Sequence, residues 1–331
     1  MIWYKDSKDD IMVSTRVRLA RNVGKYPFPM MLNEKGRELV KKELVDGVLE
    51  SNSTLSKEFT LTEMKDLSPQ ERQMLAEKHL ISFDMAKDDK GACLISKDET
   101  MSIMLMEEDH LRIQIILGGS KLSEAFETAS RVDDVIEERV KYAFSEEFGY
   151  LTACPSNTGT GMRASVMMHL PALTMTNSMS KIITSASKLG LTVRGLYGEG
   201  SKAYGNLYQL SNQVTLGLSE KEIIENLENI AEQIKKHELD ARERLKDNID
   251  LADKLSRSYG TLKYARKMTS QEAKSLLSDV ILGKNMGIID TTEAPLMEMM
   301  VESEPALIGK GEALSPEERD IKRAEMLREN V

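Results

Sequence analysis

The sequence predicts an α+β fold, in which a sheet flanked by helices is followed by a helical C-terminal region. Between about residues 10 and 218, short β-like runs bounded by Gly, Pro and Asp alternate with helical stretches. After Leu218 the pattern becomes helical. With 331 residues, of which 40% are hydrophobic, the chain is long enough for two domains with a sizeable core.

The β-like runs give the expected strands, at residues 100–106, 111–117, 162–170 and 191–194. Helices are expected at residues 34–49 and 69–79. A long helix is expected after Ser219, because Ser219 and Glu222 form a capping box that satisfies free amides at a helix start. Apolar residues then recur every three or four positions and form one stripe, which indicates core packing.

Two further capping boxes, at residues 269–272 and 315–318, predict helices in a C-terminal domain of residues 246–331. Pro316 would take the first helical position, where its missing N–H does no harm. The preceding domain covers residues 1–242. The segment 296–301 is rich in methionine, whose adaptable thioether suits an irregular core, and a dimer interface is the alternative interpretation.

The bulk composition argues against several classes of protein. A formal net charge of −9 argues against nonspecific nucleic-acid binding through bulk charge. The two cysteines, Cys93 and Cys154, are too few for a disulfide framework. The N-terminus lacks the pattern of a signal peptide, and no apolar run approaches the ~18 residues that span a bilayer. We therefore expect a cytoplasmic protein that binds neither a membrane nor, directly, nucleic acid.

Arginines stand at four separated places, each beside a turn or a strand end. Arg16 and Arg18 lie two residues apart and would point to the same face of an extended strand. The others are Arg112, Arg163 and Arg194. A planar, permanently charged guanidinium binds phosphate oxygens in pairs, so this set suits a triphosphate. For the first pair taken alone, a solvated strand face is the alternative.

The segment 106–112 joins two β-like runs and is expected to form a hairpin turn with three carboxylates at its tip, Glu107, Glu108 and Asp109. A carboxylate placed there would hold a guanidinium bidentately, orient its nucleophilic nitrogen and accept its proton. A metal site is not favoured, because no His or Cys with ligand spacing accompanies the turn.

The segment 153–167 places Cys154 before Gly159 and Gly161, and Arg163 after them. The glycines are expected to let the backbone approach a ligand closely, although the segment lacks the full pattern of a P-loop or a dinucleotide fingerprint. Cys154 is either a buried apolar thiol or, beside the arginines, a thiolate that pairs with a guanidinium.

A second glycine-rich loop, at residues 195–200, presents Glu199 directly after a short strand. Such a loop is flexible unless it folds over something, so we expect it to act as a lid. Glu199 would then supply a second carboxylate for a bound guanidinium.

Four motifs, in this order, resemble the catalytic domain of phosphagen (guanidino) kinases: Ser14-Thr-Arg-Val-Arg18, Glu107-Glu-Asp-His-Leu-Arg112, Cys154-Pro-Ser-Asn-Thr-Gly-Thr-Gly-Met-Arg-Ala-Ser165 and Arg194-Gly-Leu-Tyr-Gly-Glu199. The resemblance covers about residues 10–242 and implies a mainly antiparallel sheet flanked by helices. It implies that Glu108 and Glu199 hold and activate the acceptor guanidinium, and that Cys154 lies on the substrate side. It also implies a nucleotide site made of Ser14, Thr15, Arg16, Val17, Arg18, His79, Arg112, Arg163, Ala164, Ser165, Val166, Met167, Arg194, Gly195, Leu196, Tyr197, Gly198 and Glu199.

Within that superfamily the chain is most similar to bacterial protein-arginine kinases of the McsB type. Phosphagen kinases carry a helical domain before their first motif, whereas 13 residues precede Ser14, which would leave the cleft open to an arginine within a polypeptide. Protein-arginine kinases also carry a helical C-terminal domain. The segment 319–324 resembles their phosphoarginine-binding signature, matched by Arg319, Asp320, Arg323 and Ala324. Arg319 and Arg323 would share one helix face and hold a phosphate, and a solvated charged face is the alternative.

The resemblance therefore implies an ATP-dependent, Mg²⁺-assisted kinase that transfers the γ-phosphoryl group to arginine side chains of proteins. It further implies a homodimer, and a Clp-type unfoldase or protease and a heat-shock repressor as partners in a stress response. Two alternatives stay open. One is a kinase of free arginine or a related small guanidine, and the other is a noncatalytic adaptor that binds phosphoarginine.

Overall fold

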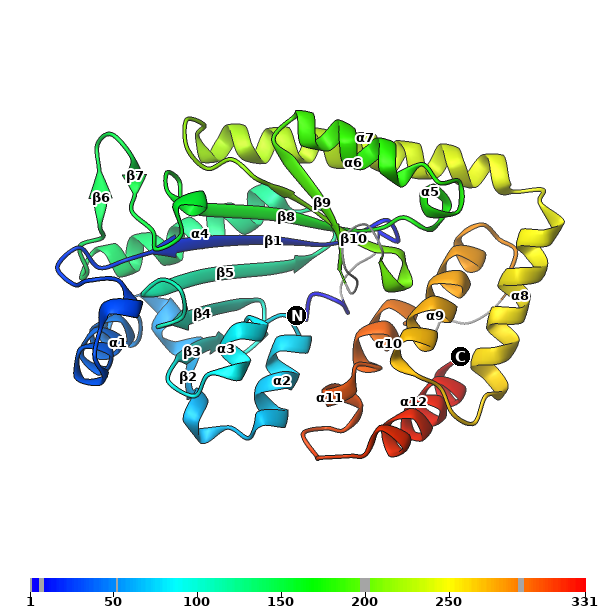
Figure 1. Ribbon diagram of the computed structural model, residues 1–331, viewed down its shortest axis with the longest axis horizontal. Helices are drawn as coiled ribbons and strands as arrows, with labels where there is room; N and C mark the ends of the chain where they lie inside the picture. Colours follow the sequence, from blue (N-terminus) through cyan, green and yellow to red (C-terminus); the bar gives the residue numbers. More distant parts are fainter. Residues whose placement is uncertain (1, 6–8, 52, 197–202, 291–294) are drawn as a thin grey trace.

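The computed structural model describes residues 2–5, 9–51, 53–196, 203–290 and 295–331 of the chain. Within these ranges an eight-stranded sheet forms the centre of the molecule, in the order β2-β3-β4-β5-β1-β8-β10-β9, and neighbouring strands run antiparallel (Figure 1). Its strands are β1 (Met12–Arg21), β2 (Phe59–Glu63), β3 (Ala92–Ser96), β4 (Met101–Leu105), β5 (Leu111–Gly118), β8 (Met162–His169), β9 (Leu191–Gly195) and β10 (Leu207–Asn212). A separate hairpin pairs β6 (Phe144–Ser145) with β7 (Gly149–Tyr150). The mainly antiparallel sheet is confirmed.

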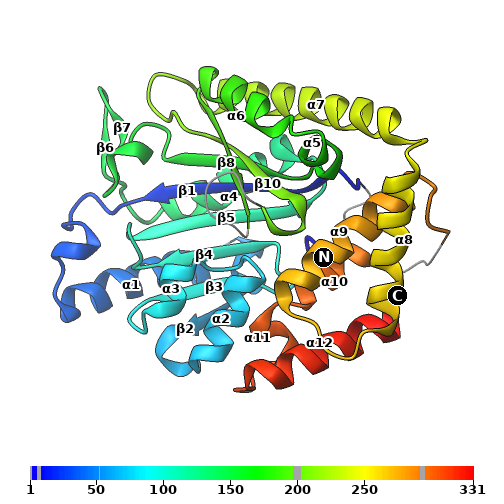
Figure 2. The ribbon, with the colours of Figure 1, turned by 45° about the vertical axis from the view of Figure 1, so that its right-hand side comes forward.

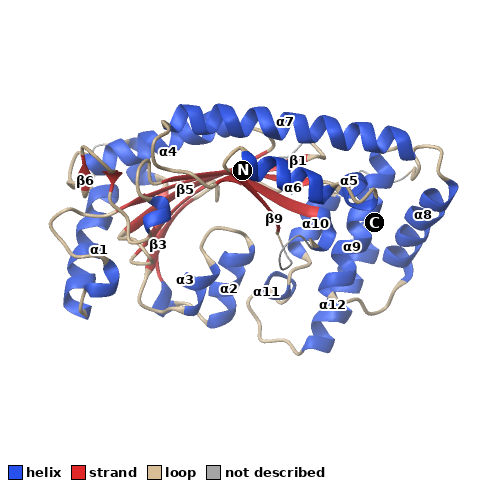
Figure 3. Ribbon diagram, turned by 45° about the horizontal axis from the view of Figure 1, so that its top comes forward, coloured by secondary structure: helices blue, strands red, loops and turns tan. Residues whose placement is uncertain are grey.

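One face of the sheet is covered by helices, as Figure 3 shows for α4, α6 and α7. The helices that pack on this side are α1 (Glu34–Leu49), α4 (Leu122–Glu137), α5 (Pro171–Met175), α6 (Met179–Lys188) and α7 (Glu220–Leu245). Their apolar side chains meet alternate strand residues, such as Val17 and Val166, in the larger hydrophobic core. The opposite face is therefore left for other contacts.

That opposite face is flanked at the β3–β4 side by α2 (Pro69–Glu77) and α3 (Phe83–Lys87). The C-terminal helices gather at the end of the molecule away from the β6–β7 hairpin (Figures 1 and 2). They are α8 (Ile249–Tyr264), α9 (Ser270–Asn285), α10 (Leu296–Glu302), α11 (Pro305–Ile308) and α12 (Pro316–Asn330). Short 3₁₀ turns lie at Pro29–Met31, Thr54–Lys57, Met64–Asp66, Pro155–Asn157 and Tyr204–Asn206.

Most expected elements lie close to observed ones. The capping boxes at Ser219 and Ser315 are confirmed, with both hydrogen bonds of each box present. At Thr269 the side chain accepts the amide three residues ahead, which also marks a helix start. The expected strand ends differ from the observed ones by at most one residue. The helix expected at residues 69–79 is shorter: α2 ends at Glu77, and His79 adopts a φ of 63° that a helix does not allow.

A second hydrophobic core joins the free face of the sheet to the C-terminal helices. Trp3, Ile116 and Met167 belong to the same buried cluster as Leu277 and Met300. The methionine-rich segment therefore packs in a core, as its first interpretation held. The C-terminal helices therefore pack against the free face of the sheet.

Two buried glutamates connect elements that are far apart in sequence. Glu77 accepts the amides of Ala306 (2.9 Å) and Leu307 (3.0 Å) at the start of α11. Glu238 of α7 does the same for the first amides of α5, at 3.0 and 2.9 Å. Each carboxylate satisfies backbone donors that a helix start leaves free, so it fixes a short helix to another helix.

His169 also links the two cores. It lies fully buried on β8, and its Nε2 is 2.7 Å from the hydroxyl of Ser278 on α9. Burial lowers the pKa of His169 to about 3. Within the described ranges, no helix is both long and apolar enough to cross a membrane.

We predict that the protein becomes less stable as the pH is lowered, partly because of His169. In the unfolded chain this side chain takes up a proton near its ordinary pKa of about 6.5, and in the native state it resists protonation down to a pKa of about 3. The unfolded state therefore binds more protons in this window, and lowering the pH from 7 to 5 removes about 2 kcal/mol of stability through this group. Between pH 7 and 5, the free energy of unfolding from urea denaturation should therefore fall by about 2 kcal/mol less in His169→Gln than in the wild type. His237→Gln, at an exposed histidine, is the control, and equal slopes for both variants would contradict the prediction.

Candidate active site

The arginines lie together on the free face of the sheet because the strand register aligns them. On β1, Arg18 is opposite Arg163 of β8, and Ala20 is opposite Arg112 of β5. Arg16 lies one step further along the same face, and its Nη2 donates to Gln209 Oε1 at 3.0 Å. Three strands that are distant in sequence thus present one cluster of cations.

Strand alternation separates the predicted nucleotide residues into two sets. Ser14 and Ser165 share the face of the arginines, and Met167 lies there too. The side chains that point into the core on the opposite face are those of Val17, Ala164 and Val166. The hydroxyl of Thr15 donates to Gly119 O at 2.8 Å, on the helix-covered side. These four side chains do not reach the arginine face, so any contact of theirs with a nucleotide is restricted to the backbone.

The arginine cluster is electrostatically strained. Burial, and then the charges of Arg112 and Arg163, lowers the pKa of Arg16 to about 10. Burial and the same kind of repulsion hold the pKa of Arg18 well below its ordinary value. The Nε of Arg18 is enclosed and has no hydrogen-bond partner among the described residues. A buried donor without a partner and mutually repelling cations are both relieved by a bound anion, so the cluster fits a polyphosphate.

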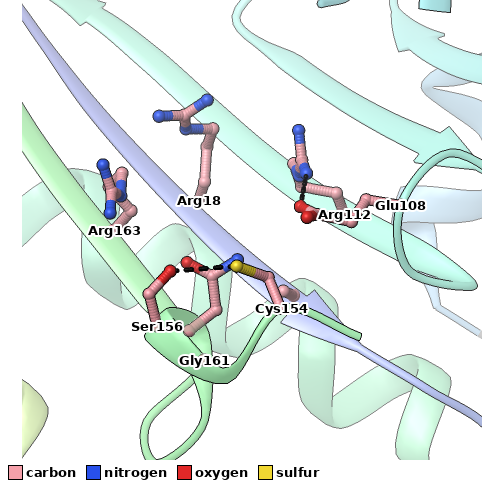
Figure 4. Close-up of a pocket in the computed structure, with 9 residues that line it drawn as sticks. Arg18, Glu108, Arg112, Cys154, Ser156, Gly161 and Arg163 are labelled. Carbon is pink, nitrogen blue, oxygen red and sulfur yellow. Dashed lines mark hydrogen bonds and ion pairs between the residues drawn. The ribbon is translucent and has the colours of Figure 1, made fainter. Parts of the chain in front are cut away.

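A cavity of about 250 Å³ opens between these arginines and two loops (Figure 4). It is lined by Arg18, Ala20, Glu108, Arg112, Cys154, Ser156, Asn157, Gly161 and Arg163. Three of the predicted arginines, one predicted glutamate and the predicted cysteine therefore meet at one place. A second cavity of about 560 Å³ continues past Arg18, Glu108 and Arg112 toward α3.

The acidic turn between β4 and β5 holds Arg112 from both sides. Its Nη1 is 2.6 Å from Glu107 Oε2, and its Nη2 is 3.2 Å from Glu108 Oε2. Glu107 also accepts the hydroxyl of Ser82 and is nearly enclosed, whereas the side chain of Glu108 is 44% exposed. Glu108 is thus the accessible carboxylate of the turn. The predicted hairpin is confirmed, but Asp109 is buried at 2% exposure instead of standing at the tip.

The glycines of the next loop contact the protein's own backbone. A Cβ at Gly159 would lie 2.1 Å from Thr215 O, and one at Gly161 would lie 2.7 Å from Ala20 O. Their φ angles of 116° and 63° are also unfavourable for other residues. The expected close approach is therefore mainly to neighbouring segments, and it brings half-buried Cys154 to the cavity.

His79 lies outside the small cavity but beside the arginine face. Gln114 Nε2 donates to His79 O at 2.7 Å, and the ring of Trp3 packs edge-on against its imidazole. Burial, and then the charges of Arg16 and Arg18, lowers the pKa of His79 to about 3, so the imidazole is neutral. Sequence reasoning missed Gln114 and Gln209, because neither stands in a motif and only strand pairing brings them to the site.

Some predicted residues lie at or beyond the limits of the description. Arg194 and Gly195 end β9, and Arg194 is exposed beside Gln209 of β10. Leu196 follows, with its amide bonded to Leu207 O at 2.9 Å. Tyr197, Gly198 and Glu199, and with them the expected lid, fall outside the described residues. Among the residues that are described, no group of three or more His, Cys, Asp or Glu side chains is arranged to hold a metal.

In the segment 319–324 the two arginines differ sharply. Arg323 is 1% exposed, and it donates to Ser303 O (2.7 Å), Met268 O (2.8 Å) and Asp320 Oδ1 (2.7 Å). Arg319 is partly exposed, and Ala324 is buried. Arg323 thus ties α12 to the end of α10 and the start of α9, which leaves Arg319 as the more accessible cation of the pair.

We predict unequal effects of removing these arginines. Arg323→Ala should lower the free energy of unfolding by about 3 kcal/mol, because it leaves two buried carbonyls and a carboxylate without their donor. Arg319→Ala, the matched control on the same helix, should change it by less than about 0.5 kcal/mol. Urea denaturation of both variants measures the difference, and similar values would show that Arg323 has no structural role.

The chain is similar to known proteins along nearly all of its length. Residues 40–241 match the family of the ATP:guanido phosphotransferase C-terminal catalytic domain, and residues 248–331 match the protein-arginine kinase McsB C-terminal domain. The chain is 50% identical over 321 residues to a protein-arginine kinase of Caldanaerobacter subterraneus subsp. tengcongensis, covering 96% of this chain and 95% of that protein. It is 47% identical over 340 residues to a protein-arginine kinase of Bacillus cereus, covering 99% and 95%.

Solved structures agree on the fold. A lombricine kinase matches with a TM-score of 0.61 and 25% identity, over 71% of this chain and 68% of that one. The duplicated taurocyamine kinase of Schistosoma mansoni with bound transition state analog components matches with a TM-score of 0.63 and 25% identity, over 80% of this chain and 38% of that one. By their names, these two proteins are kinases of lombricine and of taurocyamine.

Proposed function

The chain belongs to the protein-arginine kinases, a family of ATP:guanido phosphotransferases, and we propose that its arginine-lined cavity transfers the γ-phosphoryl group of ATP to arginine side chains of proteins. The observation that carries this proposal is the cavity itself. Three cations, an accessible carboxylate and a half-buried thiol line a space of about 250 Å³. Cations suit the phosphates, and the carboxylate suits the acceptor guanidinium.

In the proposed reaction, the arginines orient the triphosphate and stabilise the negative charge on the transferred group. A guanidinium nitrogen of the acceptor attacks the γ-phosphorus, the bond from phosphorus to the bridging oxygen breaks, and ADP leaves. Glu108 accepts the proton that the attacking nitrogen loses. The Glu108 side chain is 44% exposed, so its carboxylate can accept the acceptor guanidinium. Arg112 meanwhile stays paired with Glu107.

Mg²⁺ would enter the site together with ATP and would offset part of the phosphate charge, since this ion usually binds through substrate phosphates with one or two carboxylates. The two other groups of the proposed acceptor site are Cys154, which lines the cavity, and Glu199, which lies outside the described residues. The strained arginine cluster supports the nucleotide part of this assignment.

The proposal is tested by incubating the protein with ATP, Mg²⁺ and an unfolded basic protein. The expected product is acid-labile phosphate on arginine, located by mass spectrometry under non-acidic conditions. Excess free arginine distinguishes the alternative acceptor, because a kinase of small guanidines would be saturated by it. Unmodified protein arginines would reject the proposal. Phosphorylation of the free arginine would then favour the kinase of small guanidines, and no phosphorylation of either acceptor would favour the adaptor.

We predict that Glu108→Gln separates transfer from nucleotide binding. The variant keeps the size of the side chain but cannot accept the proton, so kcat should fall by about 10²- to 10⁴-fold. The dissociation constant of ATP, measured by calorimetry, should change less than about twofold, because the phosphate-facing arginines stay in the sheet. Glu124→Gln, at an exposed glutamate of α4, is the control. An active Glu108→Gln would show that another group takes the proton.

Further parts of the proposal rest on the family relationship. We propose that phosphorylated proteins are passed to a Clp-type protease, that a heat-shock repressor is a substrate, and that the chain forms a homodimer in the cytoplasm. The domain boundary near residues 242–246 and a phosphoarginine site at Arg319 belong to the same proposal. Calorimetry with phosphoarginine, on wild-type protein and Arg319→Ala, tests the last of these, and equal binding would reject it.

A further inference from the structure

Asp109 lies between the two loops that form the proposed acceptor side of the cavity. It follows Glu108 in the acidic turn, but its side chain is 2% exposed and does not line the cavity. Its Oδ1 accepts two hydrogen bonds of 2.7 Å each, from Asn22 Nδ2 and from the amide of Ala153. Ala153 directly precedes Cys154. One buried oxygen therefore connects the residue after Glu108 to the residue before Cys154.

Asn22, the other donor, reinforces this connection. It stands directly after β1, and its Nδ2 also donates to Leu151 O at 3.1 Å. Its Oδ1 accepts the amide of His110 at 2.9 Å. The Oδ1 of Asn22 thus bonds to the acidic turn, and its Nδ2 bonds both to that turn and to the loop that carries Cys154. Asn22 and Asp109 together hold three separate segments at one point.

The second oxygen of Asp109 has no such support. Its Oδ2 is enclosed, and it has no hydrogen-bond partner in the described part of the chain. A buried carboxylate oxygen without a donor costs free energy, so stability alone does not explain this residue. A charged acceptor does, however, form shorter and stronger hydrogen bonds than a neutral one, which suits a role in fixing distances.

We propose that Asp109 is a positioning residue that sets the separation of Glu108 and Cys154, and so the place of the acceptor guanidinium. This inference rests on the proposed transfer to arginine. The nucleotide side is independent of it, since its arginines stand on β1, β5 and β8, where the ladder of strand hydrogen bonds holds them. Loss of Asp109 should therefore affect catalysis and leave nucleotide binding intact.

Two substitutions test the proposal. Asp109→Leu keeps the approximate size but removes the acceptor, and kcat should fall about 10²-fold, the cost typical of a reacting group displaced by about 1 Å. Asp109→Asn keeps an acceptor oxygen and should retain activity within about tenfold of the wild type. The dissociation constant of ATP should stay within about twofold in both. Asp279→Leu is the matched control, because Asp279 is buried too but bonds to Lys254 and Ser258 in the C-terminal helices.

The two cysteines supply a second readout that does not need enzymatic activity. Cys154 is half-buried in the loop, and its alkylation by iodoacetamide should become several-fold faster in Asp109→Leu but not in Asp279→Leu. Cys93 is fully buried on β3, and burial raises its pKa to about 12, so it should stay unmodified while the protein is folded. Modified Cys93 in Asp109→Leu would show that Asp109 stabilises the whole fold and not the spacing of the two loops, which would overturn the proposal.

The remaining outcomes separate the possible failures. Full activity of Asp109→Leu, or unchanged reactivity of Cys154, would overturn the positioning role. If Asp109→Asn were as inactive as Asp109→Leu and its Mg²⁺ requirement had shifted, the carboxylate would act on the reactants directly, which also overturns it. A wild-type protein that does not phosphorylate arginine would reject the proposed function. The alkylation of Cys154 would still show whether Asp109 holds the loop of Cys154 in place.

Discussion

Mutual repulsion among arginines is the constraint on which this structure depends. Arg16, Arg18 and Arg163 lie on neighbouring strands in a partly dehydrated space, where each positive charge makes the next less favourable. Flexible loops would let such cations move apart and become hydrated. Central strands do not, because their backbone hydrogen bonds on both sides fix the register. The sheet therefore stores an electrostatic cost that a polyphosphate can relieve.

The groups on the acceptor side are held differently, by buried polar side chains under the loops. Arg21 donates to Asp133 Oδ2 through Nε (3.0 Å) and Nη2 (2.7 Å), and to Thr160 O through Nη1 (3.0 Å). The ring of Tyr150 packs on the same guanidinium, with its centroid 3.4 Å from the central carbon. The loop that carries Cys154 thus packs against Arg21, whose charge is neutralised by Asp133. Strands hold the nucleotide side, and side-chain networks hold the acceptor side.

The sequence predicted those features that depend on local pattern. Alternation in the strand of Arg16 and Arg18 was enough to place both on one face, and serine and glutamate three residues apart were enough to mark the start of α7. Features that depend on distant partners escaped it. Nothing near Asp109 indicates that its oxygen accepts the amide of Ala153, 44 positions away. Nothing near Arg323 indicates that its guanidinium donates to the carbonyls of Ser303 and Met268. Charged residues look alike in sequence whether they face water or a carbonyl.

The second hydrophobic core has a consequence for any attempt to study the catalytic part alone. The family matches divide the chain between residues 241 and 248, but this core does not follow that division. Trp3, Ile116 and Met167 lie on the N-terminal side of it and are covered by helices from the other side. A fragment ending at α7 would expose an apolar patch beside the arginine cluster, and such patches promote aggregation. Removing the C-terminal helices would therefore yield an aggregation-prone fragment rather than a smaller version of the enzyme.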